Sequence, residues 1–215
     1  MSSLPVPLDA AAVSAATRQL ADRDPRLATL LAAHGVPPLW LKGPGFETLV
    51  DIVLGQQVSL TSARAALERV RVAAGSVTAE AVAVLGEDGL RAAGQTRQKA
   101  HYLMGLAEAV MTGRLDLDVV ATLPDEAAIG TLTTHPGIGR WTADIYLLMG
   151  LGRPDVWPST DLALIVQART SCGLGPAEAG GAIAHMATAW SPYRSVAARM
   201  LWQAYLIERG RPLDA

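Results

Sequence analysis

The 215-residue chain is poor in cysteine and phenylalanine, with one of each. The single cysteine, Cys172, excludes a disulfide framework and any metal or iron–sulfur cluster held by several thiolates, and it favours a reducing cytoplasm. No apolar run reaches the ~20 residues that a membrane-spanning helix needs. The first residues lack a basic segment followed by an apolar core, so we expect no secretory signal. These absences predict a cytoplasmic protein without a membrane partner.

An excess of positive charge is also missing. The net charge is −2 and the pI is about 6.1, whereas a protein that coats nucleic acid is strongly basic. Of the 18 basic residues, only Lys42 and Lys99 are lysines. The charge therefore argues against extensive electrostatic binding of nucleic acid. It leaves open a small site that binds phosphate through backbone amides.

Apolar residues recur at helical spacing along most of the chain, and half of all residues are hydrophobic. Alternation of period two and repeats of 20–50 residues are absent from the sequence. The pattern predicts an all-helical protein, folded as one large domain or as two small lobes. The expected helices cover residues 8–33 with a break at Asp24-Pro25, a segment from Phe46 to Gly55, a segment capped by Ser59 or Thr61, and the ranges 78–85, 88–93, 97–112, 124–131, 140–150, 162–172, 176–190 and 193–208.

The segment from His135 to Asp161 carries the most chemical information. Gly137 and Gly139 permit a turn so tight that successive N–H groups point outward, and these amides open a helix whose N-terminus attracts anions such as phosphate. A dinucleotide-binding fingerprint is disfavoured, because a helix precedes the turn and Thr142 stands where a third glycine is needed. Two plainer readings stay open. The glycines also suit an ordinary helix–helix turn, and Asp161 also suits a helix N-cap.

Several motifs together resemble the helix-hairpin-helix DNA glycosylases of base excision repair, in the branch of the alkylpurine (3-methyladenine type II, AlkA-like) enzymes. They are GFETLVDIVLGQQVS, RQKAHYL, HPGIGRWTAD, DVWPSTDLAL and SPYRSVAARMLW, and they cover residues 40–202. The resemblance implies two helical lobes around a cleft, residues 1–45 with 155–215 and residues 46–154, with the hairpin at about 125–150. It also implies that the N-terminal β lobe of longer relatives is absent or truncated.

The resemblance implies that Asp161 is the catalytic carboxylate, which stabilises positive charge on the deoxyribose while the base leaves. Trp141 stands where bifunctional relatives carry the lysine that forms a Schiff base with the sugar. The expected enzyme is therefore a monofunctional glycosylase without AP-lyase activity. Its expected substrates are alkylated bases such as 3-methyladenine and 7-methylguanine, flipped out of the duplex.

The resemblance also implies roles for other residues. Gln57 is expected to fill the gap that the flipped base leaves, and the hairpin carbonyls are expected to hold a Na⁺ or K⁺ ion, although no cofactor is expected to be required. The implied pocket residues are Trp141, Trp202, Ile145 and Leu162; the implied DNA-binding residues are Gln57, Gly137, Ile138, Gly139, Arg140 and Thr142; the implied cation ligands are the carbonyls of Thr133, His135 and Ile138.

The expected partner is double-stranded DNA that carries a damaged base, and one site in one cleft needs only a monomer. In a bacterial cell we expect association with the nucleoid. Two alternatives stay open. The first is a non-catalytic helix-hairpin-helix module that binds DNA within a repair complex, and the second is a glycosylase for other damaged bases.

Overall fold

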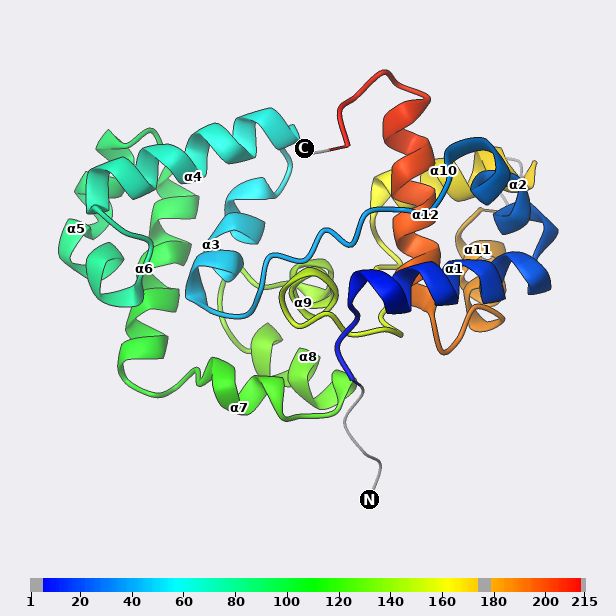
Figure 1. Cartoon of the computed structure of the whole chain (residues 1–215). Helices are drawn as coiled ribbons and strands as arrows, with labels where there is room; N and C mark the ends of the chain where they lie inside the picture. The colour runs from blue at the N-terminus through cyan, green and yellow to red at the C-terminus, as the bar shows by residue number, and fades with distance from the viewer. Residues whose placement is uncertain (1–5, 174–178, 214–215) are drawn as a thin grey trace. The chain divides into compact units, whose positions relative to one another are not determined.

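The computed structural model describes residues 6–173 and 179–213, and this part of the chain is helical without strands, which confirms the predicted fold class (Figure 1). Contacts between residues divide the chain into two compact units. Unit 1 combines the chain up to Leu41 with the chain from Leu147 onward, and unit 2 runs from Lys42 to Tyr146. Both limits lie earlier in the chain than the predicted lobe limits, 45 and 154.

Unit 1 is built around one buried helix near the C-terminus. Nearly every residue of this helix, α12, is buried, and α1, α2 and α10 pack against it. The guanidinium group of Arg199, on this helix, is fully buried. It donates to the carbonyl of Ser195 one turn earlier and to the carbonyls of Leu39 and Leu148, which ties two distant segments to α12. The helices of this unit are α1 (Ala10–Arg23), α2 (Pro25–His34), α10 (Leu162–Cys172), α11 (Ala179–Thr188) and α12 (Arg194–Ile207).

Unit 2 contains the other helices, most of them joined by short loops. α5 packs against α6, α3 packs against α4, and α8 packs against α9. The two short helices expected at 78–85 and 88–93 form one element with a kink at Gly86, whose φ is +74°. The helices are α3 (Phe46–Gly55), α4 (Leu60–Ala74), α5 (Ala79–Ala92), α6 (Arg97–Met111), α7 (Leu117–Ala121), α8 (Asp125–Thr133) and α9 (Arg140–Ile145).

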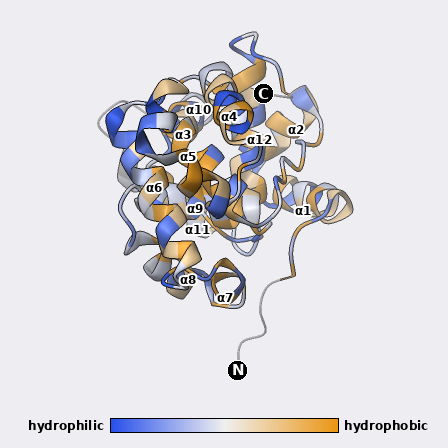
Figure 2. Cartoon of the chain, turned by 90° about the vertical axis from the view of Figure 1, so that its left-hand side faces the viewer, coloured by the Kyte–Doolittle hydropathy of each residue, from blue (hydrophilic) through white to orange (hydrophobic). Residues whose placement is uncertain are grey.

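Polar residues at the helix starts explain most of the helix boundaries. Asp9 and Asp24 cap α1 and α2, and Pro25 occupies the first turn of α2, as its fixed φ permits. Ser59 caps α4, which resolves the choice between Ser59 and Thr61. Along the helices of both units hydrophobic and hydrophilic residues are interspersed, as expected for helices with one buried face (Figure 2).

Two details differ from the sequence prediction. The five-residue helix α7, which Asp116 caps, was not expected because five residues are too few to show helical periodicity. The helix expected over 140–150 is α-helical only to Ile145 and continues as a π-helical segment, Tyr146–Gly150. The predicted start of a helix at Pro176 lies outside the described residues. None of the described helices is long and apolar enough to cross a membrane.

Candidate functional site

The Gly-x-Gly hairpin of unit 2 joins α8 to α9, and its two glycines have different roles. Gly137 has a φ of +87°, and a Cβ atom there would lie 2.6 Å from the ring of Tyr102. Gly139 has an ordinary φ of −87°, a Cβ atom added there would meet nothing within 4 Å, and the residue is the N-cap of α9. The close approach and the left-handed backbone at Gly137 require glycine, whereas Gly139 tolerates a side chain.

No side chain caps α9 with a hydrogen bond. The first amides of a helix lack intrahelical partners, so a helix start without a side-chain cap suits an anionic ligand. Inside the turn, the amide of Ile138 donates to the carbonyl of His135 at 3.1 Å. The side chain of Ile138 is buried, so this residue faces a ligand only with its backbone.

The side chain of Arg140 is bound to two carboxylates within unit 2. Its guanidinium donates to Asp144 at 2.9 Å and to both oxygens of Glu126 at 2.9 and 3.1 Å. Burial lowers the pKa of Arg140, but hydrogen bonds and charge attraction from Glu126 and Asp144 outweigh it and raise the pKa above the usual value. The carboxylate of Asp144 is buried and forms an i,i+4 ion pair with Arg140. Any contact of the Arg140 side chain with phosphate must compete with these acids.

Three predicted residues of α9 differ in their exposure. Thr142 and Ile145 are buried, at 2% and 4% exposure, whereas Trp141 is half-buried. The hydroxyl of Thr142 accepts a hydrogen bond from the amide of Gln56 at 2.8 Å. The side chains of Thr142 and Ile145 therefore pack in the core of unit 2. The contact of Thr142 with DNA and the contact of Ile145 with the flipped base stay predictions.

The turn after α3 presents Gln57 to solvent in an uncommon conformation. Gln57 is exposed and has a φ of +59°, in the left-handed region that non-glycine residues seldom adopt. Gln56, just before it, directs its side chain to the hairpin and donates to the carbonyl of Gly137 at 2.8 Å. The ammonium of Lys99 donates to the carbonyls of Leu54 and Gln56 at 2.6 and 3.0 Å. The sequence predicts a role for Gln57, which stays a prediction, but it does not reveal the contacts that Gln56 and Lys99 make beside it.

Asp161 lies in unit 1, at the start of α10, and is 9% exposed. Its Oδ1 atom accepts from the amide of Leu164 at 2.9 Å and from the indole nitrogen of Trp202, on α12, at 3.1 Å. The N-cap that the sequence left open as an alternative is therefore present, and it holds the carboxylate in one orientation. The structure brings Asp161 and Trp202 together, and it places the neighbouring Leu162 at the surface, 73% exposed.

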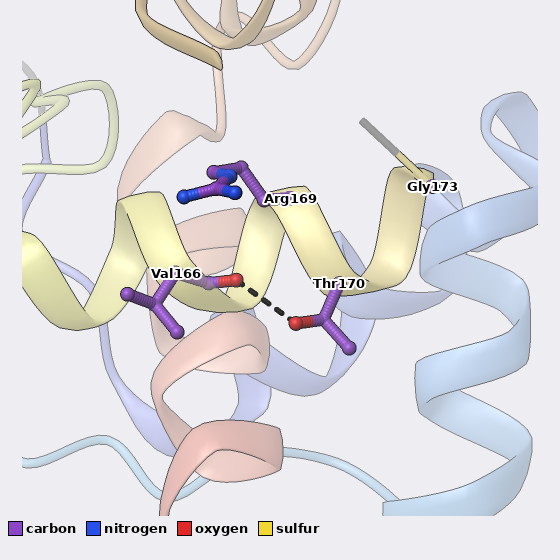
Figure 3. A pocket seen from close by; sticks show the side chains of 4 residues that line it. All are labelled: Val166, Arg169, Thr170 and Gly173. Carbon is purple, nitrogen blue, oxygen red and sulfur yellow. Dashed lines mark hydrogen bonds between the residues drawn. The ribbon is translucent and has the colours of Figure 1, made fainter. Parts of the chain in front are cut away.

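Unit 1 also contains a pair of packed tryptophans and a hollow on α10. Trp157 packs edge-on against Trp190 at 5.3 Å between ring centroids. Further along α10, a hollow is lined by Val166, Arg169, Thr170 and Gly173 (Figure 3). The hydroxyl of Thr170 donates to the carbonyl of Val166 at 3.1 Å (Figure 3). The side chain of Arg169 points away from this hydrogen bond. Neither feature has the nucleophile, base or paired acids of a second catalytic site.

The hairpin carbonyls suit a monovalent cation better than a transition metal. Carbonyl oxygens are hard ligands of the kind that alkali ions prefer. Among the described residues no backbone amide of a turn, loop or cap donates to the carbonyls of Thr133 and Ile138, and the carbonyl of His135 accepts the amide of Ile138. The described residues contain no cluster of three or more His, Cys, Asp and Glu side chains that could hold a metal ion.

Comparison with known proteins identifies the family. The family model of the HhH-GPD superfamily base excision DNA repair proteins matches residues 50–179, more than half of the chain. The chain belongs to this superfamily. The matched segment contains both the hairpin and Asp161.

Individual HhH-GPD relatives agree with this assignment. DNA-3-methyladenine glycosylase 2 of Escherichia coli is 32% identical over 179 residues, which cover 77% of this chain and 60% of that protein. YfjP of Bacillus subtilis is 27% identical over 186 residues, 83% of this chain and 65% of that protein. The chain thus spans less than two thirds of the length of these two relatives. The solved structure of the 3-methyladenine DNA glycosylase Mag1 of Schizosaccharomyces pombe, in complex with abasic DNA, is 28% identical and matches with a TM-score of 0.80, covering 88% of this chain and 95% of that one.

Proposed function

We propose that this protein is a monofunctional DNA glycosylase that flips an alkylated base, such as 3-methyladenine or 7-methylguanine, out of the duplex and hydrolyses its N-glycosidic bond. The observation that carries the proposal is the largely buried carboxylate of Asp161. The amide of Leu164 and the indole of Trp202 hold it in place. Relatives named as 3-methyladenine glycosylases support the substrate class.

In the proposed reaction the charge of Asp161 stabilises the transition state. The N-glycosidic bond breaks, its electron pair leaves with the base, and positive charge develops on C1′ and the ring oxygen of the deoxyribose. A water molecule adds to C1′, and the carboxylate accepts its proton. A fixed carboxylate in a site with little water stabilises the sugar cation more strongly than a solvated one does.

The two lysines support a reaction that uses water rather than an amine. Lys42 pairs with Asp51 at 2.7 Å, and Lys99 binds two backbone carbonyls, all within unit 2. Position 141, at the second residue of α9, carries a tryptophan. Without an amine at that position the Schiff base that precedes strand cleavage does not form. We therefore propose that the enzyme has no AP-lyase activity.

Binding of the duplex is assigned to the hairpin and to the turn after α3. The amides of Gly139 and Arg140 open α9 and bind a backbone phosphate. The carbonyls of Thr133, His135 and Ile138 would hold a Na⁺ or K⁺ ion, and such an ion would supply positive charge for binding a phosphate.

The base itself is assigned to aromatic and apolar side chains. Trp141 in unit 2 and Trp202 in unit 1 are each proposed to contact the electron-poor or cationic alkylated purine, because an aromatic face attracts positive charge. Ile145 in unit 2 and Leu162 in unit 1 are proposed to contact the base as well. Gln57 occupies the space that the flipped nucleotide leaves. We further propose that the protein acts as a cytoplasmic monomer on double-stranded DNA.

The test is a panel of duplexes carrying 3-methyladenine, 7-methylguanine, 1-methyladenine, ethenoadenine or hypoxanthine. We expect free alkylated base to be released with the DNA strand intact until alkali or heat is applied. Borohydride should trap no protein–DNA adduct. Release of no base from any duplex would overturn the proposed activity, and a trapped adduct would overturn the monofunctional mechanism.

A further inference from the structure

The side chain of Gln56 joins two loops that the proposed function uses separately. We propose that Gln56 is a positioning residue that holds the turn carrying Gln57 in register with the hairpin, so that insertion into the duplex and binding of the phosphate occur as one coupled event. The inference rests on the proposed function, because it concerns how the same site engages DNA. All the contacts that carry it lie within unit 2.

Both N–H bonds of the Gln56 amide group are used. One donates to the carbonyl of Gly137 and the other to the hydroxyl of Thr142, each at 2.8 Å. The carbonyl of Gly137 belongs to the same rigid peptide group as the amide of Ile138. Thr142 lies in the first turn of α9. One side chain therefore fixes both the hairpin peptide and the start of the helix that follows it.

Lys99 holds the backbone of the same residue, Gln56. Its ammonium donates to the carbonyl of Gln56, which shares a peptide group with the amide of Gln57, and to the carbonyl of Leu54 near the end of α3. A cation at the C-terminal end of a helix is favourable. Burial lowers the pKa of Lys99. The backbone of Gln56 is thus held by α6 while its side chain holds the hairpin.

Such support is needed because the conformation of Gln57 is unfavourable on its own. A left-handed φ of +59° at a residue other than glycine costs free energy. Once the turn is free to relax, Gln57 loses its defined direction. The neighbouring Val58 and Leu60 are also exposed, at 45% and 46%, so the turn itself contributes little apolar burial that would hold it. The hydrogen bonds of Gln56 and Lys99 supply that restraint.

The test uses Gln56→Met, which keeps the length of the side chain and removes both donors. 2-Aminopurine placed opposite a tetrahydrofuran abasic site reports, through its fluorescence, the unstacking that insertion causes. We expect the fluorescence response at saturating protein and the single-turnover rate of base release to fall about tenfold. The matched control is Gln95→Met. Gln95 is a buried glutamine of unit 2 whose amide donates to the carbonyls of Ala66 and Ala93, away from the hairpin, and its variant should keep the wild-type response.

A double-mutant cycle separates positioning from a merely structural role. If Gln56 acts through Gln57, Gln56→Met should add little loss once Gln57→Ala is present. If the fold loss of the double variant equals the product of the fold losses of the two single variants, the proposal is overturned. If Gln56→Met fails to fold, Thr142→Val removes one acceptor of the same amide and should show the same non-additivity with Gln57→Ala at a smaller amplitude.

The fluorescence signal does not depend on catalysis. A wild-type protein that gives the insertion signal but releases no base would contradict the proposed function and leave this inference intact. Base release that is unchanged in Gln56→Met, with an unchanged fluorescence response, would contradict the inference and leave the proposed function intact.

Discussion

The hairpin of unit 2 and the carboxylate of unit 1 differ in which part of the residue is proposed to act, the backbone in the hairpin and a side chain at the carboxylate. In the proposed function the hairpin acts through its backbone, and the side chains around it, such as Tyr102 and Gln56, shape and hold that backbone. At the carboxylate the proposed functional group is the single side chain of Asp161. Its backbone neighbour Leu164 and the indole of Trp202 serve to orient it.

This contrast shows where each region is vulnerable. A backbone site fails when a substitution changes the path of the chain, whatever charge the new residue carries. A side-chain site fails when its charge is removed, even if the chain path is kept. Substitutions of each kind, matched between the two units, test whether binding and chemistry are divided in this way.

The largest effect is expected for Asp161→Asn, which removes the charge and keeps the N-cap, since Asn caps helices about as well as Asp. We predict a fall in the single-turnover rate of base release of at least about 100-fold, the size typical for loss of one electrostatic group in a transition state. The affinity for the duplex should stay close to the wild type. Asp9→Asn, at the N-cap of α1 in the same unit, is the control and should retain full activity.

The second test compares the two hairpin glycines. Gly137→Ala should destabilise the hairpin by roughly 2 kcal/mol or more and weaken duplex binding, because φ is +87° and the new Cβ meets the Tyr102 ring. Gly139→Ala should leave the thermal stability unchanged, since its φ is ordinary and the space around it is open. Its Kd for the duplex should stay within about threefold of the wild-type value. Equal losses in the two variants would show that the hairpin is shaped by something other than Gly137.

The third test concerns the acid stability of unit 1. Burial raises the pKa of Asp24, but hydrogen bonds from the Arg26 side chain, the Trp190 indole and the Arg26 amide outweigh it and lower the pKa to about 2. A lowered carboxyl pKa contributes stability that is present above the ordinary value of 3.8 and is lost as the pH falls toward 2. We expect a loss on the order of 2 kcal/mol over that window.

Urea unfolding at pH 7, 4 and 2.5, followed by tryptophan fluorescence, measures this loss. The signal reports mainly on unit 1, because Trp141 alone of the five tryptophans lies in unit 2. Asp24→Asn should flatten the pH dependence between 4 and 2.5. If the free energy of unfolding of Asp24→Asn falls with pH as steeply as that of the wild type, groups other than Asp24 cause the loss.

The smallest effect is expected for Trp202→Phe. This change keeps an aromatic face and removes the indole N–H that binds Asp161. Loss of one hydrogen bond to a charged group is worth roughly 1–2 kcal/mol, so the rate of base release should fall about five- to thirtyfold while Kd changes little. A comparable rise in Kd would instead place Trp202 mainly in contact with the bound DNA.

The helical fold was predictable from the sequence, because helix breaks, capping residues and apolar periodicity are local signals. The predicted break at Asp24-Pro25 and the predicted cap at Ser59 mark the starts of α2 and α4. The helix α7 and the π-helical continuation after Ile145 were missed, since a five-residue helix has no detectable period and a π-helical segment has no distinctive pattern.

The candidate site could be predicted only in part for a similar reason. The spacing of Gly137, Gly139 and Asp161 along the chain is visible in the sequence. The support of Gln57 is not, because Lys99 lies more than forty residues from the carbonyls it binds and Gln56 more than eighty from the hairpin. The sequence also could not show that Gly137 alone of the two glycines needs to be glycine, which depends on the Tyr102 ring.

The most direct test of the division between the units is one experiment on Asp161→Asn and Gly137→Ala side by side. For each variant the Kd for a duplex with 3-methyladenine and the single-turnover rate at saturating protein are measured together. We predict that Asp161→Asn loses the rate and keeps the Kd, whereas Gly137→Ala loses affinity and keeps most of the rate once the duplex is bound. If both variants lose rate and affinity in the same proportion, binding and chemistry are not divided between the hairpin and the carboxylate.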